Sequence, residues 1–503
     1  MVGRQQRRPA MRGNGTRTFT AGDPLHHHEE QNAERPSQTG GADSRHAIFV
    51  PEDEHQKSNQ APQPAVSCPG GSHGRQAHPL RRGPVVSPLH HAVIAFRDET
   101  HGCLNYRRSG CYILFSVKQI DFLYFDAGGG HRSAALALKS VIEEQQRPWD
   151  IHLVNVQEVL DSLDIFRKYT GIRMEDVYNH MLKRGYTLGS KQLLVAMHGI
   201  IRIYHRSQVK LLTKFWTERE TDLVVSLIPN FNRAIFEALR AADRARNRPA
   251  TPMVTILTDL ADYPPHFWIE RQDQYFVCGT GRAEEHARAM GHTDDRVFRT
   301  SGMIIRPHFY APVKQSRVEE RERLGLDPEL PTGLVLFGGQ GSNQMVSIAK
   351  AVARSGLKLQ LILICGRNQK LRDRLNALKL GFPMHVEGFT KEIPFFMHLS
   401  DFFIGKPGPG SISEAIHMNL PVIVERNSWT LPQERYNADW IEEHQVGVVV
   451  PSFRKIGEGL KALLDQRNFA KFKQNTAAIN NRAVFEIPDI LEGLLSREPV
   501  STA

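Results

Sequence analysis

The chain has 503 residues, of which 40% are hydrophobic, so it is long enough for two or more domains with substantial cores. Its formal net charge of +10 points to an anionic partner, which leaves nucleic acid, an acidic membrane surface and a nucleotide-bearing substrate open. The five cysteines show no CxxC pair or zinc-finger spacing, and the sequence shows neither a signal peptide nor the run of roughly 18 apolar residues that a spanning helix needs. We therefore expect a reduced, cytoplasmic chain that is neither secreted nor transmembrane.

Residues 1–110 are rich in Pro, Gly, Gln, Arg and His and hold almost no periodic apolar positions. Such a segment buries too little apolar surface to offset the entropy of ordering, so we expect a disordered low-complexity extension. The adjacent histidines His26, His27 and His28 reflect this composition more than a metal site. The acidic residues of the segment argue against a transit peptide.

From residue 117 onward, short apolar strands alternate with amphipathic helices, which is the pattern of parallel βαβ units. The strands fall into two series, so we expect two Rossmann-like domains, over residues 117–308 and 331–470. Residues 309–330 are expected to form a linker and the first helix of the second domain, and residues 471–503 the C-terminal helices. The expected strands are 121–125, 151–154, 222–227, 253–257, 274–277 and 297–300, followed by 334–337, 359–365, 384–386, 401–404, 421–424 and 447–450.

A glycine-rich turn, with Gly128, Gly129 and Gly130, follows the first of these strands and leads through His131 into a helix. Glycines let a ligand approach the backbone, and the free N–H groups of a helix start suit an anion or a polar sugar. The helix dipole disfavours a charged imidazole at His131, which keeps the ring in the neutral form that a general base needs. A tight turn with an exposed histidine is the alternative, because short glycine-rich turns are weak evidence.

A basic segment without any Asp or Glu covers residues 177–217 of the first domain. Its apolar residues recur at i, i+3 and i+4 spacing, a pattern typical of an amphipathic helix on an anionic bilayer. The same pattern fits a helix with one face in the core and a basic solvated face, or a nucleic-acid patch without a recognisable motif. Its basic residues are Lys183, Arg184, Lys191, Arg202, Arg206, Lys210 and Lys214.

In the second domain, a second glycine loop with Gly338, Gly339 and Gly341 follows a strand. It lacks the Lys-Ser/Thr pair of a Walker A motif, so an ATPase is a poor interpretation. Further on, a Pro/Gly turn leads into a helix whose first amides, around Gly410 and Ser411, suit a diphosphate.

Two groups of polar residues follow these loops. Glu414 lies one turn into the helix after Ser411, where its carboxylate suits ribose hydroxyls, although an acid in a first turn is common. Gln433, Glu434 and Asn437 stand at a loop-to-helix junction and offer the hydrogen bonds that sugar recognition uses, as surface loops also do.

Taken in this order, the motifs resemble those of the monogalactosyldiacylglycerol synthases of glycosyltransferase family 28, over about residues 120–494. The resemblance implies the GT-B architecture, with two Rossmann-like domains. It implies an inverting transfer of galactose or glucose from a UDP-sugar to diacylglycerol, which gives a monoglycosyldiacylglycerol. It further implies that no metal or other cofactor is required, that no nucleic acid is bound, and that the enzyme is peripheral on an anionic membrane surface. The oligomeric state does not follow.

The resemblance also implies a role for each matching residue. His131 is expected to be the base at the acceptor hydroxyl, with Asp259 as the alternative. Gly129, Gly130, Trp268, Arg202, Arg206, Lys210 and Lys214 are expected on the acceptor or membrane side. The expected donor-site residues are Gly338, Gly339, Gly341, Phe389, Gly410, Ser411, Glu414, Gln433, Glu434 and Asn437. Two other functions stay open, a UDP-sugar epimerase of the same architecture and a catalytically silent nucleotide-sugar-binding protein.

Overall fold

The computed structural model describes residues 96–97, 103–108, 111–126, 129–160, 199, 201–428 and 430–497, with side chains from residue 116 onward. The predictions for His26–His28, Lys183, Arg184 and Lys191 lie outside the described residues, as does most of the segment 1–110.

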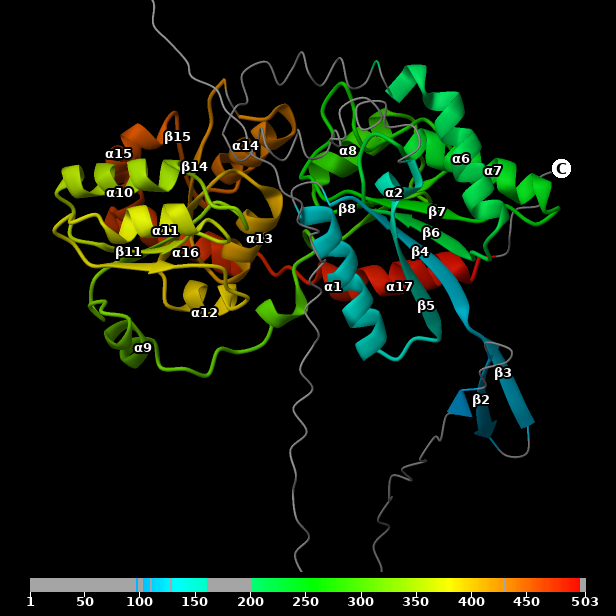
Figure 1. Ribbon diagram of the computed structural model, residues 1–503, viewed down its shortest axis with the longest axis horizontal. Helices are drawn as coiled ribbons and strands as arrows, with labels where there is room; N and C mark the ends of the chain where they lie inside the picture. The colour runs from blue at the N-terminus through cyan, green and yellow to red at the C-terminus, as the bar shows by residue number, and fades with distance from the viewer. Residues whose placement is uncertain are drawn as a thin grey trace, which may run out of the picture. The chain divides into compact units, whose positions relative to one another are not determined.

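The first sheet has six parallel strands in the order β5-β4-β6-β7-β8-β9 (Figure 1). Strand β4 lies between β5 and β6, so that Ile120 stands opposite Ile151 on one side and Leu223 on the other. The strands are β4 (Lys118–Tyr124), β5 (Trp149–Asn155), β6 (Leu223–Ser226), β7 (Met253–Ile256), β8 (Tyr275–Cys278) and β9 (Val297–Arg299). The helices described along this part of the chain are α1 (Gly130–Glu144), α2 (Val156–Leu160), α6 (His205–Thr217), α7 (Asn232–Ala245) and α8 (Gly281–Ala289).

The second sheet also has six parallel strands, in the order β12-β11-β10-β13-β14-β15. They are β10 (Thr332–Leu336), β11 (Gln360–Ile364), β12 (Met384–Glu387), β13 (Phe402–Gly405), β14 (Val422–Glu425) and β15 (Gly447–Val450). Its helices are α10 (Gln344–Ser355), α11 (Gln369–Asn376), α12 (Ile393–His398), α13 (Pro409–His417), α14 (Arg435–Glu443), α15 (Ile456–Leu464) and α16 (Gln466–Ala478), with short 3-10 turns η3 (Pro432–Glu434) and η4 (Phe453–Lys455). All twelve expected strands are confirmed, and the protein has the two-sheet GT-B architecture.

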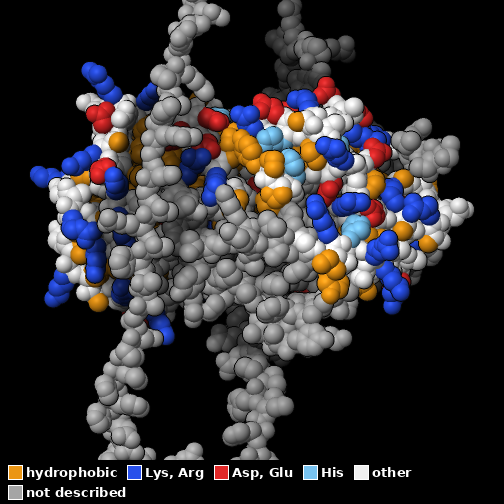
Figure 2. Space-filling view, turned by 90° about the horizontal axis from the view of Figure 1, so that it is seen from above, with side chains coloured by type: hydrophobic (Ala, Val, Ile, Leu, Met, Phe, Trp, Pro, Cys, Tyr) orange, Lys and Arg blue, Asp and Glu red, His pale blue; other side chains and the backbone are white. Residues whose placement is uncertain are grey.

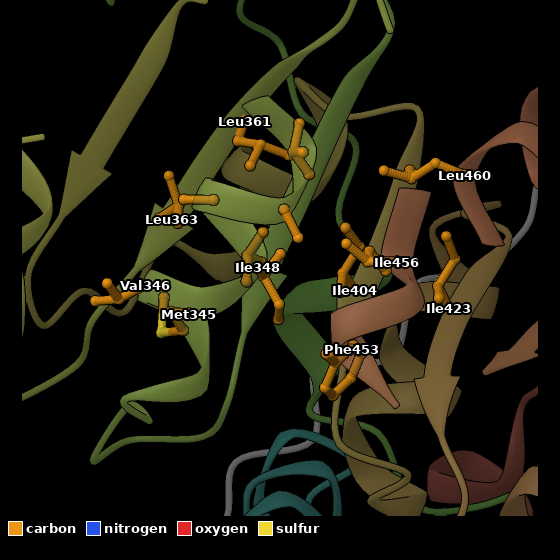
Figure 3. Close-up of a cluster of buried hydrophobic side chains, with 14 of the residues drawn as sticks. Met345, Val346, Ile348, Leu361, Leu363, Ile404, Ile423, Phe453, Ile456 and Leu460 are labelled. Atoms are coloured by element: carbon orange, nitrogen blue, oxygen red, sulfur yellow. The ribbon is translucent and has the colours of Figure 1, made fainter. Parts of the chain in front are cut away.

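Continuous apolar runs explain why these strands form parallel sheets. Every residue of β6, β7, β10, β11 and β13 is buried, as expected for strands covered by helices on both faces. Figure 3 shows one such layer, in which Met345, Val346 and Ile348 of α10 pack against the sheet together with Phe453, Ile456 and Leu460. This packing fixes the edge of the sheet from which the ligand loops emerge.

The C-terminal helix α17 (Ala483–Leu495) packs on the first sheet although it follows the second sheet in the chain. Its Val484, Ile487, Leu491 and Leu494 share a core with α1, beside which it lies in Figure 1. The sequence predicted helices over residues 471–503 but not this return to the first sheet.

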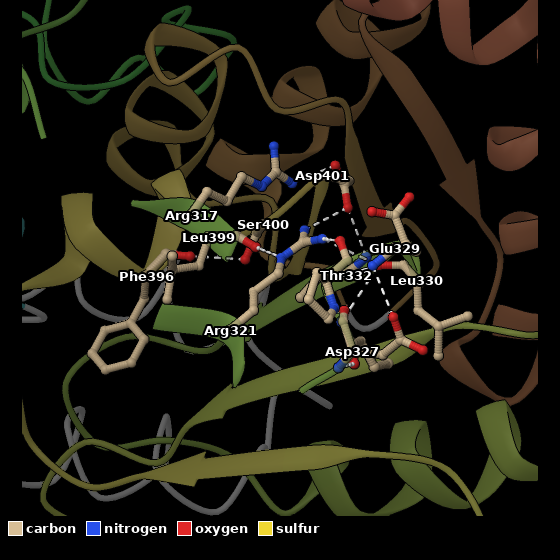
Figure 4. Close-up of polar contacts among 12 residues, drawn as sticks. Arg317, Arg321, Asp327, Glu329, Leu330, Thr332, Phe396, Leu399, Ser400 and Asp401 are labelled. Carbon is tan, nitrogen blue, oxygen red and sulfur yellow. Dashed lines mark hydrogen bonds and ion pairs between the residues drawn. The ribbon is translucent and has the colours of Figure 1, made fainter. Parts of the chain in front are cut away.

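The predicted first helix of the second domain is confirmed as α9 (Arg317–Arg323), and Arg321 anchors it (Figure 4). This guanidinium is 4% exposed and donates to the Leu399 carbonyl at 2.9 Å and to Asp401 Oδ2 at 2.8 Å. Asp401 Oδ2 also accepts from the backbone N–H of Thr332 at 2.8 Å, so one carboxylate ties α9 to the first residue of β10.

The prediction of a disordered segment over residues 1–110 is wrong at its C-terminal end. The strands β1 (Phe96–Arg97), β2 (Cys103–Arg108) and β3 (Cys111–Ser116) form an antiparallel sheet, in which Arg108 pairs with Cys111. Apolar and polar residues alternate at Leu104, Asn105 and Tyr106, which is a strand pattern. The composition averaged over 110 residues hides this short signal.

Candidate active site

His131 lies in the first turn of α1, which begins at Gly130 after Gly129 in the left-handed conformation, with φ of 77°. The side chain is partly buried, and its Nδ1 lies 3.1 Å from the hydroxyl oxygen of Thr258. Burial lowers the pKa of His131 from 6.5 to about 4, against the opposing effect of the Leu227 carbonyl. The ring is therefore neutral near pH 7, chiefly because of desolvation and not because of the helix dipole that the sequence suggested.

Trp268 lies next to this histidine, and Asp259 directly follows Thr258, which contacts it. The Trp268 side chain is fully buried, its Nε1 donates to Asp259 Oδ2 at 2.9 Å, and its ring centroid is 5.8 Å from that of His131. Burial raises the pKa of Asp259 to about 7, while the indole N–H lowers it. Trp268, expected on the acceptor or membrane side, is thus buried among the residues after β7 and next to the expected base His131.

Glu434 and Lys406, both in loops after strands of the second sheet, also act on the pKa of Asp259. The Glu434 carboxylate raises this pKa and the Lys406 ammonium lowers it. Leu260 and Ala261, which follow Asp259, pack with Tyr436, which lies between Glu434 and Asn437 in the chain, so the structure brings the acceptor-side loop and part of the predicted donor site together.

Asp262 organises the loop that carries Trp268, and the sequence analysis did not single it out. Its carboxylate is fully buried and accepts from the backbone N–H groups of Phe267 at 2.7 Å, Trp268 at 3.2 Å and Ile269 at 2.9 Å. An acid just before two prolines in an otherwise apolar loop was the available signal, since such a carboxylate has few partners other than backbone amides.

The second glycine loop has the backbone geometry that its sequence predicted. Gly338 and Gly341 have φ of 73° and 61°, and the Gly341 N–H donates to the Gly338 carbonyl at 3.1 Å. A Cβ at Gly341 would lie 2.6 Å from the Cys365 carbonyl, whereas a Cβ at Gly339 would meet nothing within 4 Å. The loop is thus packed on one side and open at Gly339, where a ligand can approach the backbone.

Helix α13 begins at Pro409, so Gly410 and Ser411 lie in its first turn, as predicted. A Cβ at Gly410 would also meet open space. Glu414 lies one turn later, and Arg306, which the sequence analysis did not assign, approaches it with 3.4 Å between Arg306 Nη2 and Glu414 Oε1. Burial raises the pKa of Glu414 to about 7, and Arg306 opposes that rise.

Gln433, Glu434 and Asn437 are brought together at the start of α14. Glu434 accepts from Lys406 Nζ at 2.9 Å, and the fully buried Asn437 donates through Nδ2 to the Pro407 carbonyl at 2.7 Å. Gln433 Oε1 and Asn437 Oδ1 are buried and have no hydrogen-bond partner among the described residues. Such acceptors carry a free-energy cost of roughly 1–3 kcal/mol each unless a ligand hydroxyl donates to them.

Tyr436, from the same helix, contacts the acceptor-side loop directly. Its side chain is 6% exposed and packs with Leu260, Ala261 and Met303. Its ring centroid lies 5.6 Å from that of Tyr263. The sequence analysis did not assign Tyr436, because an aromatic residue among polar neighbours gives no sign of which element it will meet.

Phe389, the residue expected near the nucleotide base, follows β12. Its side chain is 53% exposed, and the Arg367 guanidinium lies 4.8 Å from the ring centroid. The ring and the cation thus form an exposed pair beside the turn that contacts the second glycine loop.

Helix α6 has one buried and one basic face. Gln208, Leu212 and Trp216 are buried, whereas Arg202, Arg206, Lys210 and Lys214 are exposed at four-residue intervals along and just before the helix. Ile203 beside them is 77% exposed. The helix thus has one face in the core and a basic solvated face, and binding to an anionic bilayer by that basic face stays a prediction.

The excess of basic residues is not confined to α6. Figure 2 shows Lys and Arg side chains spread over one face of the molecule with Asp and Glu among them. Among the described residues, no helix is long and apolar enough to cross a membrane, and no group of three or more His, Cys, Asp or Glu side chains is arranged to hold a metal ion.

Comparison with known proteins gives a match to a family model in the second half of the chain. Residues 333–493 match the model of the glycosyltransferase family 28 C-terminal domain. The chain is 27% identical to monogalactosyldiacylglycerol synthase 1 of Arabidopsis thaliana, over 68% of this chain and 64% of that protein. It is 28% identical to the probable monogalactosyldiacylglycerol synthase 2 of Oryza sativa subsp. japonica, over 66% of this chain and 71% of that protein.

The spinach synthase gives a similar alignment, with 27% identity over 68% of this chain and 65% of that protein. The chain thus spans slightly less than two-thirds of the length of the Arabidopsis and spinach proteins. The similar proteins and the family of the matched domain are the ones that the sequence motifs indicated. The chain is therefore similar to monogalactosyldiacylglycerol synthases over about two-thirds of its length, and its residues 333–493 match the glycosyltransferase family 28 C-terminal domain.

Proposed function

We propose that this protein is an inverting glycosyltransferase that moves galactose or glucose from a UDP-sugar to diacylglycerol at a membrane surface. The observation that carries the proposal is the packing of Leu260 and Ala261, next to Asp259 on the acceptor side, with Tyr436 of the donor motif. The named relatives are galactolipid synthases, which favours this donor and acceptor over others.

The donor is bound by the second glycine loop, the first turn of α13 and the start of α14. Backbone N–H groups around Gly410 and Ser411 hold the diphosphate, and Glu414 accepts from the ribose hydroxyls. The unpaired Gln433 Oε1 and Asn437 Oδ1 accept from hexose hydroxyls, which removes the cost of their burial.

In the reaction, the acceptor hydroxyl oxygen attacks the anomeric carbon as the bond from that carbon to the UDP oxygen breaks. UDP leaves with the electron pair, the configuration inverts, and the hydroxyl proton passes to Asp259 or His131. A pKa of about 7 suits Asp259 for this task at neutral pH, whereas a pKa of about 4 makes His131 the weaker base. Preorganised amides stabilise the leaving diphosphate, so we expect activity without a divalent metal.

The membrane contact is the basic face of α6. Its four exposed cations and the exposed Ile203 combine attraction to anionic lipid with an apolar side chain that can enter the interface. This face lies on the helix opposite its core contacts at Leu212 and Trp216, so a bilayer can approach it without disturbing the fold.

The test is incubation of the purified protein with labelled UDP-galactose or UDP-glucose and diacylglycerol liposomes, with and without EDTA, followed by lipid chromatography. We expect one labelled monoglycosyl lipid and no loss of activity with EDTA. His131→Ala should lower turnover while UDP binding by calorimetry is kept. No glycolipid from either donor would overturn the proposal. Interconversion of the UDP-sugars without lipid product would indicate an epimerase, and UDP binding without any turnover a silent binding protein.

A further inference from the structure

We infer that Trp268 is a positioning residue of the acceptor-side centre, where its indole N–H holds the Asp259 carboxylate, its ring lies next to His131, and Asp262 fixes the loop that carries the indole. This inference rests on the proposed function. Its geometric basis is the fully buried Trp268 side chain, with 2.9 Å between Nε1 and Asp259 Oδ2 and 5.8 Å between its ring centroid and that of His131.

The backbone around Trp268 is held from two directions. Asp262 accepts from three consecutive N–H groups, those of Phe267, Trp268 and Ile269. Asn232, fully buried at the start of α7, donates through Nδ2 to the Trp268 carbonyl at 3.1 Å. The indole is therefore fixed to the first sheet and its helices, independently of the donor loops.

Asn232 is itself held in place, which extends this support to strand β6. The Ser226 hydroxyl donates to Asn232 Oδ1 at 2.6 Å, and Asn232 Nδ2 also donates to the Ile228 carbonyl at 3.0 Å. A side chain whose hydrogen bonds are all made in this way has little freedom to reorient. The position of the Asp259 carboxylate thus follows from a connected set of buried groups.

Several groups around Asp259 affect its protonation. Burial, Glu434 and Asp262 favour the protonated carboxyl, and the Trp268 N–H and Lys406 favour the carboxylate. The His131 ring, which lies next to the indole, is neutral near pH 7 because of its own burial. Among the groups that favour the carboxylate, Trp268 makes the direct hydrogen bond, so its loss should leave Asp259 protonated to a higher pH.

The chain offers a matched control for this bond. Trp216 is also fully buried and donates through Nε1 to a buried carboxylate, Asp121 Oδ2, at 3.1 Å. This pair lies in the core between β4 and α6 and belongs to no predicted site. Trp216→Phe therefore removes the same type of hydrogen bond and the same atoms as Trp268→Phe.

The first measurement is the pH dependence of kcat for the two variants. In Trp268→Phe, the acid limb should move to higher pH by roughly one unit, the size expected when a hydrogen bond to a charged group is lost. At pH 7 this lowers the ionised fraction from one-half to about one-eleventh, so kcat should fall about fivefold, with UDP affinity kept. In Trp216→Phe the acid limb should stay in place. An unmoved limb in Trp268→Phe would overturn the inference.

The second measurement needs neither catalysis nor a change at Trp268. Tryptophan emission is recorded against pH for the wild type and for Asp259→Asn, and the difference reports the effect of Asp259 ionisation on its indole neighbour. We expect a transition near pH 7 in the wild type that Asp259→Asn removes. If the wild type shows this transition but no glycosyl transfer, the proposed function fails and the Trp268–Asp259 relation stands. The same emission curve in both proteins would overturn the inference itself.

Discussion

Lys406 Nζ lies 2.9 Å from Glu434 Oε1, and these two donor-side groups act with opposite signs on the pKa of Asp259 at the acceptor side. Their side chains differ in exposure, with 46% for Lys406 and 11% for Glu434. The charges of this donor-motif ion pair therefore affect the pKa of Asp259, the group expected to take the proton from the acceptor hydroxyl.

This coupling predicts opposite pH shifts for two neutralising variants. Glu434→Gln removes a charge that raises the pKa of Asp259, so the acid limb of kcat should move to lower pH. Lys406→Met removes a charge that lowers this pKa, so the limb should move to higher pH. We expect shifts of about half a unit to one unit, with Glu458→Gln on the exposed side of α15 as an unshifted control. Shifts of the same sign in both variants would contradict the coupling.

Two glycines of the second glycine loop, Gly341 and Gly339, are expected to differ in role, the first in folding and the second in binding. Gly341 has φ of 61°, and a Cβ there would lie 2.6 Å from the Cys365 carbonyl. Gly341→Ala should therefore lower the free energy of unfolding by about 1–3 kcal/mol. At Gly339, where a Cβ meets nothing within 4 Å, Gly339→Ala should change it by less than about 0.5 kcal/mol.

The variants Gly339→Ala and Gly341→Ala also test whether this loop binds the donor or is only a structural turn. The added methyl group of Gly339→Ala would stand where the diphosphate approaches the backbone, so UDP affinity by calorimetry should fall about tenfold or more, which corresponds to roughly 1.4 kcal/mol. Denaturant unfolding and UDP titration of both variants check the two effects. Unchanged UDP affinity in Gly339→Ala would place the diphosphate elsewhere.

The raised pKa of Glu414 predicts that the free energy of unfolding depends on pH. Its pKa rises from the ordinary 4.5 to about 7 on folding, so the folded state holds the proton more tightly than the unfolded state. This stabilisation is complete below about pH 4.5 and is lost as pH rises through about 7, up to roughly 3 kcal/mol. Glu414→Gln should therefore match the wild type at low pH and be more stable than it at pH 8.

The measurement is the difference in unfolding free energy between Glu414→Gln and the wild type from pH 5 to 8. Because Asp259 titrates in the same range, only this difference isolates Glu414. Glu442→Gln, at an exposed position of α14, should give a flat difference. A flat difference for Glu414→Gln as well would show that its carboxyl is not buried in solution.

The basic face of α6 predicts binding to anionic lipid. Lys210→Glu with Lys214→Glu should weaken binding to phosphatidylglycerol liposomes in a sedimentation assay by about thirtyfold or more, because each lost cation near the surface accounts for about 1 kcal/mol and the new carboxylates repel the lipid. A matched control is Lys350→Glu with Arg354→Glu, which makes the same charge change at the same four-residue spacing on the exposed side of α10. Equal losses in the two double variants would indicate a nonspecific effect of net charge.

The strands and the glycine loops were predictable because their signals are local. An apolar run of four to seven residues followed by glycines specifies a buried parallel strand and its turn wherever the element packs. For this reason β10, Gly338 and Gly341 are as expected. The antiparallel strands β2 and β3 were missed because a biased composition over a long segment hid a short alternating pattern.

The sequence by itself determined which residues were available for chemistry, namely His131, Asp259, Glu414 and Glu434. Only the tertiary structure decided their states, because burial and contacts between segments far apart in the chain set a pKa. Desolvation makes His131 a weak base and Asp259 a better one, and Trp268, expected on the acceptor or membrane side, is buried as the donor to that carboxyl. Arg306 and Tyr436 gained their roles in the same way, since their partners lie far away in the chain and no local pattern encodes such contacts.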